Sequence, residues 1–358
     1  MRRMSRVWIA IVFCLALCFS GIGVLHSDSS ARGMIKPEQK SESSTVQPSA
    51  FVPGVYNAPQ LAKEGAPAPS NIKIKCKKKK GGKVKVTVSW SGSAAHHLIV
   101  VRDYYAGGYN EQWNYTSAHS KSFVYPVEEG IPHKFWVYLY GHAGSNRSDN
   151  SSYSKEIRKS KKFQYVGPQT LKVIQILSEN GVYGMDTFNQ IRFAHDWIVK
   201  NYSYGNVGTD SSYTFPGAFK SRTCVCEGYA KTFLTFMTCL GVPVDYVHNK
   251  KHGWNLVKLN GAWYHLDATY DDPTGSLEST TSKYPIYDYF LQSTSNLKQK
   301  SGAGAHAYAE NEWQKATSTL YDNDGDKSGY SEDMPDGTGM CSSTFTPWMN
   351  GQPMADVG

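Results

Sequence analysis

Residues 221–233 read SRTCVCEGYAKTF, and they begin the helical pattern in the second half of the chain. Two cysteines stand one residue apart, directly before a glycine. The apolar residues that follow recur at i, i+4, i+7, i+8 and i+11, which is one stripe of an amphipathic helix: Tyr229, Phe233, Phe236, Met237 and Leu240. Gly241 and Pro243 form a typical helix stop. The pattern predicts a helix that begins at or near Cys226.

The two cysteines differ in their relation to this helix. At about 100° per residue, Cys226 falls on the face of the apolar stripe, so its sulfur points toward the domain body. The partial positive charge of a helix N-terminus favours a thiolate there. Gly228 permits close approach of another backbone or of a substrate. Cys224 precedes the helix and gains less from all of this, so no role is assigned to it.

Downstream, residues 244–273 contain the dipeptide Asn260–Gly261 between alternating apolar runs, the strongest short signal for a β-hairpin. A two-residue turn pairs Leu259 with Ala262. In this register His252 and Asp267 share one face and are diagonal neighbours within side-chain reach. The other face then carries a consistent apolar set: Val257, Leu259, Tyr264 and Leu266.

A thiol at a helix N-terminus and a His–Asp pair on one sheet face are the parts needed for nucleophilic acyl transfer. His252 would take the proton of Cys226 and later protonate the leaving amine. Asp267 would fix the imidazole tautomer and stabilise its charged form. We therefore predict Cys226, His252 and Asp267 as catalytic residues, with no cofactor and no metal.

Three blander interpretations of the cysteines were weighed against this one. Cys226 could be an inert core cysteine. Cys224 and Cys226 could bind zinc together with His252 and His265, although the spacing is not that of a zinc finger. A disulfide between the two cysteines would close a strained, very small ring. We expect Asp271 and Asp272 to cap the turn before Pro273, and His195 and His265 to be packing or surface residues.

Residues 188–273 resemble the transglutaminase-like superfamily, in its bacterial exported branch. The resemblance is carried by QIRFAHDWIVKNYSY (190–204), GAFKSRTCVCEGYAKTF (217–233), HGWN (252–255) and WYHLDATYDDP (263–273), and YDYFLQSTSNL (287–297) follows as in the family. It implies an α+β, papain-like catalytic domain over residues 165–300, in which a helix N-terminal cysteine packs on an antiparallel sheet. It also implies Cys226 as nucleophile, His252 as base and Asp267 as third member. The family's small alanine after the histidine is Gly253 here.

The region before this domain has a different pattern. Short alternating runs at 83–90, 97–105, 121–127 and 133–141, separated by turn residues, predict an antiparallel β-sandwich over residues 71–160. VTVSW (86–90), FWVYLYG (135–141) and a closing strand at SSYSKEI (151–157) resemble a fibronectin type III-like module. Apolar residues at helical spacing in 168–180 and 187–204 then begin the α+β domain.

The N-terminus indicates export. Arginines at positions 2, 3 and 6 precede an apolar run over residues 7–25, so residues 1–31 are interpreted as a signal peptide or membrane anchor. Residues 32–70 are rich in Ser, Pro and Ala and predict a disordered spacer. Residues 301–358 form a C-terminal extension whose segment 322–333 has a weak likeness to a calcium loop. We expect the protein to be extracellular or at the cell surface.

The net charge of +8 includes the basic run KIKCKKKKGGKVK (73–85). It is interpreted as a solvated strand edge, with contact to an anionic cell-wall polymer as the alternative. The expected partners are a peptide or protein substrate at the cell surface, with no nucleic acid, and with the membrane only through the N-terminal segment. Transfer to an amine or to water stays open, as do a cysteine peptidase or deamidase of the same fold and a non-catalytic surface-binding protein.

Overall fold

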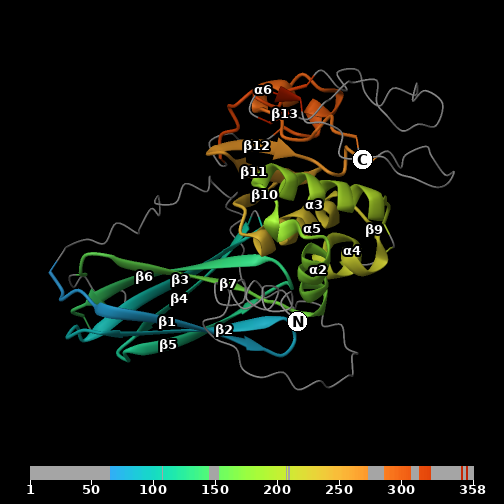
Figure 1. Ribbon diagram of the computed structural model, residues 1–358. Coiled ribbons are helices and arrows are strands. Elements are labelled where there is room, and N and C mark those ends of the chain that lie inside the picture. Colours follow the sequence, from blue (N-terminus) through green and yellow to red (C-terminus); the bar gives the residue numbers. More distant parts are fainter. Residues whose placement is uncertain are drawn as a thin grey trace, which may run out of the picture.

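The computed structural model describes residues 65–106, 108–144, 153–206, 208, 210–272, 286–307, 314–323, 348–349 and 352–353. The chain forms an antiparallel β-sandwich followed by an α+β domain. The helices of this domain lie between the sandwich and the domain's own three-stranded sheet (Figure 1). The expected fold class is therefore confirmed. The predicted signal or anchor at residues 1–31, most of the predicted spacer at 32–70 and most of the calcium-like segment at 322–333 lie outside the described residues.

The sandwich consists of a three-stranded sheet in the order β1-β2-β5 and a four-stranded sheet in the order β4-β3-β6-β7, all antiparallel. Its strands are β1 (Ser70–Lys79), β2 (Lys83–Ser91), β3 (His96–Tyr105), β4 (Gly108–Thr116), β5 (Ser120–Pro126), β6 (Pro132–His142) and β7 (Ile157–Gln164). Alternate residues from both sheets point inward and form one core, as expected for packed sheets: Val84, Val86, Ile99, Val101, Phe123, Phe135 and Val137 among them.

Two elements of the sandwich differ from the sequence interpretation. The closing strand lies at Ile157–Gln164 and not at 151–157. Half of its residues, IRKSKKFQ, are charged, so the period-two pattern survives only in Ile157 and Phe163, which pack against the core. β4 was not predicted, because its sequence GYNEQWNYT has no clear alternation. The lysine-rich β1 is an edge strand of its sheet, with its lysines largely in solvent, as the strand-edge interpretation expects.

The second domain begins with helices that pack around a central one. They are α2 (Pro168–Glu179), α3 (Thr187–Asn201), α4 (Phe215–Ser221) and α5 (Cys226–Leu240), with short 3-10 turns η1 (Val182–Gly184) and η2 (Asp210–Tyr213). A two-stranded parallel pair, β8 (Ser203–Tyr204) and β9 (Thr223–Cys224), precedes α5. The predicted start of α5 at Cys226 and its stop at Gly241, which adopts a left-handed conformation, are both confirmed.

The sheet behind α5 is antiparallel in the order β10-β11-β12, with β10 (Val244–His248), β11 (Gly253–Leu259) and β12 (Ala262–Leu266). Leu259 pairs with Ala262, so the predicted hairpin register is confirmed. Asn260 and Gly261 have φ values of 50° and 87°, the left-handed conformations that a tight hairpin turn requires. The predicted apolar set of this sheet joins the helix core, while Trp254 and Leu256 pack on the other side with Ala316.

Two consecutive glutamates between β5 and β6 join the sandwich to the α+β domain. Glu129 Oε1 accepts the backbone N–H groups of Gln169 at 2.5 Å and Thr170 at 2.8 Å, at the start of α2. Glu128 accepts the backbone N–H of Phe215 at 2.5 Å, at the start of α4, and the Lys231 ammonium of α5 at 2.9 Å. The module therefore supplies anions to two helix N-termini of its neighbour.

The chain after the hairpin folds back over the sheet. α6 (Thr294–Leu297) and the 3-10 turn η3 (Ser301–Gly304) lie beyond β12, and a further two-stranded pair is formed by β13 (Trp348–Met349) and β14 (Gln352–Pro353). His306, Ala316 and Tyr321 of the expected C-terminal extension are buried against the α+β domain. None of the helices that the structure describes is both long and apolar enough to span a membrane.

Candidate active site

Cys226 is the first residue of α5, and its side chain is partly exposed. The residue before it, Val225, is the N-cap and provides no side-chain hydrogen bond to the helix. The first backbone N–H groups of a helix have no intrahelical acceptor. The sulfur therefore lies at an uncapped helix N-terminus, where an anion is stabilised.

Cys224 is fully buried and is not part of this exposed site. Burial is the main cause that raises the pKa of its thiol, so it stays protonated. A Cβ at Gly228 would lie 2.7 Å from Cys224 Cβ and 2.8 Å from its sulfur. Because Gly228 has no side chain, the Cys224 side chain can pack directly against the helix. Packing is therefore the role of Cys224, to which the sequence assigned none.

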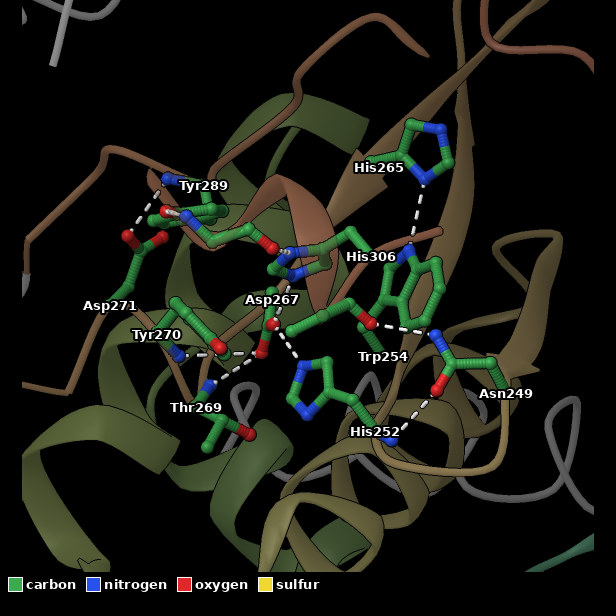
Figure 2. Close-up of polar contacts among 12 residues, drawn as sticks. Asn249, His252, Trp254, His265, Asp267, Thr269, Tyr270, Asp271, Tyr289 and His306 are labelled. Atoms are coloured by element: carbon green, nitrogen blue, oxygen red, sulfur yellow. Dashed lines mark hydrogen bonds and ion pairs between the residues drawn. The ribbon is translucent and has the colours of Figure 1, made fainter. Parts of the chain in front are cut away.

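His252 and Asp267 meet at the open end of the hairpin, one residue before β11 and one residue after β12. His252 Nε2 lies 2.5 Å from Asp267 Oδ2 (Figure 2). Asp267 Oδ1 accepts the backbone N–H groups of Thr269 at 2.9 Å and Tyr270 at 3.4 Å, which fixes the carboxylate. Because Nε2–H donates to the carboxylate, Nδ1 is the ring nitrogen left to act as a base.

The pKa shifts of His252 and Asp267 favour an imidazolium paired with a carboxylate. Burial disfavours the imidazolium, but the Asp267 carboxylate and then Cys226 as a hydrogen-bond partner outweigh it and raise the pKa of His252 to about 10. Burial works against the carboxylate in the same way, and His252 and His306 outweigh it, so the pKa of Asp267 lies well below its usual range. The structure therefore brings the three predicted site residues together.

A second histidine, His306, reaches the same carboxylate. Its Nε2 lies 2.7 Å from Asp267 Oδ2, the oxygen that also faces His252. His306 is 3% exposed and stacks on Tyr289 (Figure 2). Sequence reasoning missed this residue, because it lies in the Gly- and Ala-rich stretch SGAGAHAYAE with no periodic pattern or motif around it.

Asn249 holds both histidines in place. Its Oδ1 accepts the backbone N–H groups of Lys251 at 2.8 Å and His252 at 3.0 Å, while its Nδ2 donates to the carbonyls of Ala305 at 2.7 Å and Ala307 at 2.8 Å. One side chain thus ties the loop that carries His252 to the segment that carries His306. The Trp254 ring stacks on His252, with 5.7 Å between centroids. Asn249 and Trp254 were not singled out from the sequence.

Gly253 stands where the sequence resemblance predicts an alanine, and Tyr246 fills the space beside it. A Cβ at this position would lie 2.4 Å from the Tyr246 hydroxyl and 2.9 Å from its ring. The phenol of β10 therefore occupies the space that an alanine methyl group would need. The glycine on β11 therefore compensates for the large Tyr246 side chain on the neighbouring strand β10.

Within the described residues, one group of His, Cys, Asp and Glu side chains has its ligand atoms close enough for a metal ion: His252, Asp267 and His306. The N···O distances of 2.5 Å and 2.7 Å are those of hydrogen bonds, with both rings facing one oxygen. We interpret the group as a hydrogen-bonded cluster. The zinc alternative fails at His265, because one ring nitrogen accepts the Trp254 N–H and the other bonds to the Thr294 hydroxyl. Cys224 and Cys226 form no disulfide with each other.

The other candidates weighed from the sequence have structural partners. His195 is fully buried, with Nδ1 2.9 Å from Asp196 and Nε2 3.1 Å from Asp271. Burial opposes its charged form, but these two carboxylates outweigh it and raise the pKa of His195 to about 9. Asp272 accepts the Tyr229 hydroxyl. These groups join α3, α5 and the chain after β12 into one polar core layer.

Two solved structures are similar to parts of this chain. The solved structure described as "a Putative Cysteine Protease from Cytophaga hutchinsonii" is similar at 13% identity and TM-score 0.24, over 56% of this chain and 78% of that one. A fibronectin type III domain of human collagen XX is similar at 15% identity and TM-score 0.20, over 29% of this chain and 100% of that one. At these TM-scores the likenesses support no conclusion about function. No curated protein matched the chain.

The match of a protein-family model is more specific. It covers residues 180–268, the range that contains α3, α5 and the β10–β12 sheet together with Cys226, His252 and Asp267. The model describes the transglutaminase-like superfamily, and residues 180–268 of this chain match it as a transglutaminase-like domain.

Proposed function

We propose that the protein is an exported cysteine enzyme that acts on amide bonds of peptide or protein substrates through a thioester intermediate, with Cys226 as nucleophile. The observation that carries the proposal is the His252 Nε2–Asp267 Oδ2 contact of 2.5 Å beside the partly exposed Cys226 at an uncapped helix N-terminus. This arrangement supplies a nucleophile, its base and the group that orients the base.

In the proposed reaction, Nδ1 of His252 takes the thiol proton and the thiolate attacks the amide carbonyl carbon. The negative charge on the carbonyl oxygen is stabilised by backbone N–H groups at the start of α5. The C–N bond then breaks, His252 gives its proton to the leaving amine, and the acyl group remains on sulfur. An amine or a water attacks the thioester and passes a proton to His252, which returns it to the sulfur as the C–S bond breaks.

We propose that the exposed side chain of Tyr204 contacts the substrate. It is 57% exposed and belongs to β8, which pairs with the strand directly before α5. Partial burial is the main cause that raises the pKa of its phenol, and Cys226 is the next. An exposed aromatic ring next to a nucleophile suits an extended peptide chain.

The setting of the proposal comes from the sequence. The basic and apolar residues 1–25 support export, and lysine-rich β1 on the edge of the sandwich supports contact with an anionic cell-wall polymer. The β-module is held to the catalytic domain by Glu128 and Glu129. We propose that it acts as a spacer or docking module at the cell surface.

The test is mass spectrometry of a peptide library incubated with the protein, with and without a primary amine, comparing wild type with Cys226→Ala. Incorporated amine identifies a transferase and shorter peptides a peptidase. Conversion of a side-chain amide to a carboxylate, with ammonia released and no amine incorporated, identifies a deamidase. Each product must be absent with Cys226→Ala. A wild-type protein that forms none of these products, or a variant that forms them equally well, would overturn the proposal and favour a non-catalytic binding protein.

A further inference from the structure

His306 is a buried histidine that the proposed reaction does not use. It follows η3 and lies among aromatic rings, with 5.1 Å from its ring centroid to Tyr289, 4.8 Å to Tyr270 and 5.0 Å to His252. Figure 2 shows it on the side of Asp267 opposite His252. A polar ring in such a position is retained only if its hydrogen bonds are made.

Both ring nitrogens of His306 face acceptors. Nδ1 lies 2.7 Å from the carbonyl oxygen of Gly302, and a carbonyl can only accept a hydrogen bond. Nδ1 therefore carries a proton. Nε2 lies 2.7 Å from Asp267 Oδ2, so its state depends on whether this oxygen is protonated.

The surroundings of Asp267 decide that question. Oδ1 receives two backbone N–H groups, from Thr269 and Tyr270, and Oδ2 receives Nε2 of His252. Each of these partners faces the carboxylate as a donor, which is the environment of an ionised carboxylate. Nε2 of His306 must then donate as well. With a proton on each nitrogen, the His306 ring is an imidazolium.

We infer that His306 is a positioning residue of the proposed active site. Its imidazolium is fixed between Gly302 and Asp267, and its positive charge makes His252 release its proton more readily. The inference rests on the proposed function for its catalytic meaning, while the protonation of His306 stands on the hydrogen bonds alone. A simple triad has one cation against one carboxylate. Here a second cation shares that carboxylate and repels the proton that His252 holds.

The size of the effect follows from the distance between the rings. Two unit charges about 5 Å apart, at an effective dielectric constant between about 20 and 80, shift a titration by roughly 0.5 to 2.5 pH units. The titratable groups that face His306 are those of Asp267, His252, Tyr270 and Tyr289, with neutral His265 behind them. Removing the His306 charge should therefore strengthen the hold of His252 on its proton by about one pH unit.

The experiment measures the rate of alkylation of Cys226 by iodoacetamide against pH in the full chain, for wild type, His306→Gln and the module variant His119→Gln. Glutamine keeps a donor for Asp267 but carries no charge. The upper inflection of the profile reports loss of the His252 proton. We expect it to move up by about one pH unit in His306→Gln and to stay in place in His119→Gln, because His119 is an exposed residue of the sandwich.

Nitrogen-15 NMR of the histidine rings in the wild-type protein gives a second readout that requires no variant to fold. We expect both ring nitrogens of His306 to be protonated at neutral pH. A neutral His306, or an inflection that does not move in a folded His306→Gln, would overturn the inference. If the inflection moves and the wild type forms no product from any amide, the proposed function fails while the inference stands.

Discussion

Glu129 of the β-module should stabilise the catalytic domain, because it caps a helix that has no cap of its own. The N-cap of α2 is Gly167, which makes no side-chain hydrogen bond. Glu129 Oε1 takes its place, 2.5 Å from the N–H of Gln169 and 2.8 Å from that of Thr170. A Cβ at Gly167 would lie 2.5 Å from Glu129 Cδ, so the glycine makes room for the carboxylate.

The perturbation is Glu129→Ala. Loss of an N-cap costs about 0.5–2 kcal/mol, and loss of an anion at a partly buried helix N-terminus costs up to about 2 kcal/mol. The two terms overlap, and we expect the free energy of unfolding to fall by about 2 kcal/mol. For a domain of this size that corresponds to a fall in Tm of roughly 4–8 °C. Differential scanning calorimetry of the full chain measures it.

Two further variants test the reasoning. Glu129→Gln keeps an acceptor oxygen without the charge, so it should lose about half as much, about 1 kcal/mol. Glu179→Ala removes an anion from the opposite end of α2, where a negative charge is not favoured, and should leave the Tm unchanged or slightly raised. If Glu129→Ala destabilises no more than Glu179→Ala does, the capping role assigned to Glu129 is refuted.

The remaining predictions concern the core and the cysteines. Gly228→Ala should lower the free energy of unfolding by about 1–3 kcal/mol, because its Cβ would lie 2.7 Å from Cys224 Cβ and 2.8 Å from the Ser212 carbonyl oxygen. The control Gly184→Ala, whose Cβ would have nothing within 4 Å, should be nearly neutral. Urea unfolding measures both variants. Iodoacetamide at neutral pH should label Cys226 at least about tenfold faster than Cys224 or Cys76. Burial raises the pKa of the latter two thiols, that of Cys76 to about 11. Equal labelling, measured by peptide mass spectrometry, would contradict this prediction. The raised pKa of His195, about 9, adds stability that is fully present below the unfolded value near 6.5 and lost as pH rises through 9, so the free energy of unfolding should fall by an amount of the order of 3 kcal/mol across that window. His195→Gln should remove this part of the pH dependence, and an unchanged slope would count against the buried ion pair.

Several parts of the molecule could be predicted because their signals are local. The helix from Cys226 to Leu240 follows from an apolar stripe and a glycine stop, and the hairpin register follows from Asn260–Gly261. The contact between His252 and Asp267 then follows from the register alone. β4 and β7 could not be placed correctly, because polar and charged residues hide the period of two that marks a strand.

The sequence alone therefore determined the order of the two folded parts, the helix that presents Cys226 and the pair that faces it, since neighbours in the chain carry those signals. Only the tertiary structure decided what surrounds them. Glu129 contacts Thr170 across 41 residues of sequence, and His306 contacts Asp267 across 39. No motif or periodicity in the sequence around these residues indicates either contact. Such contacts arise because buried charges and helix ends must find partners wherever the packed chain provides them. They decide whether the site carries one cation or two.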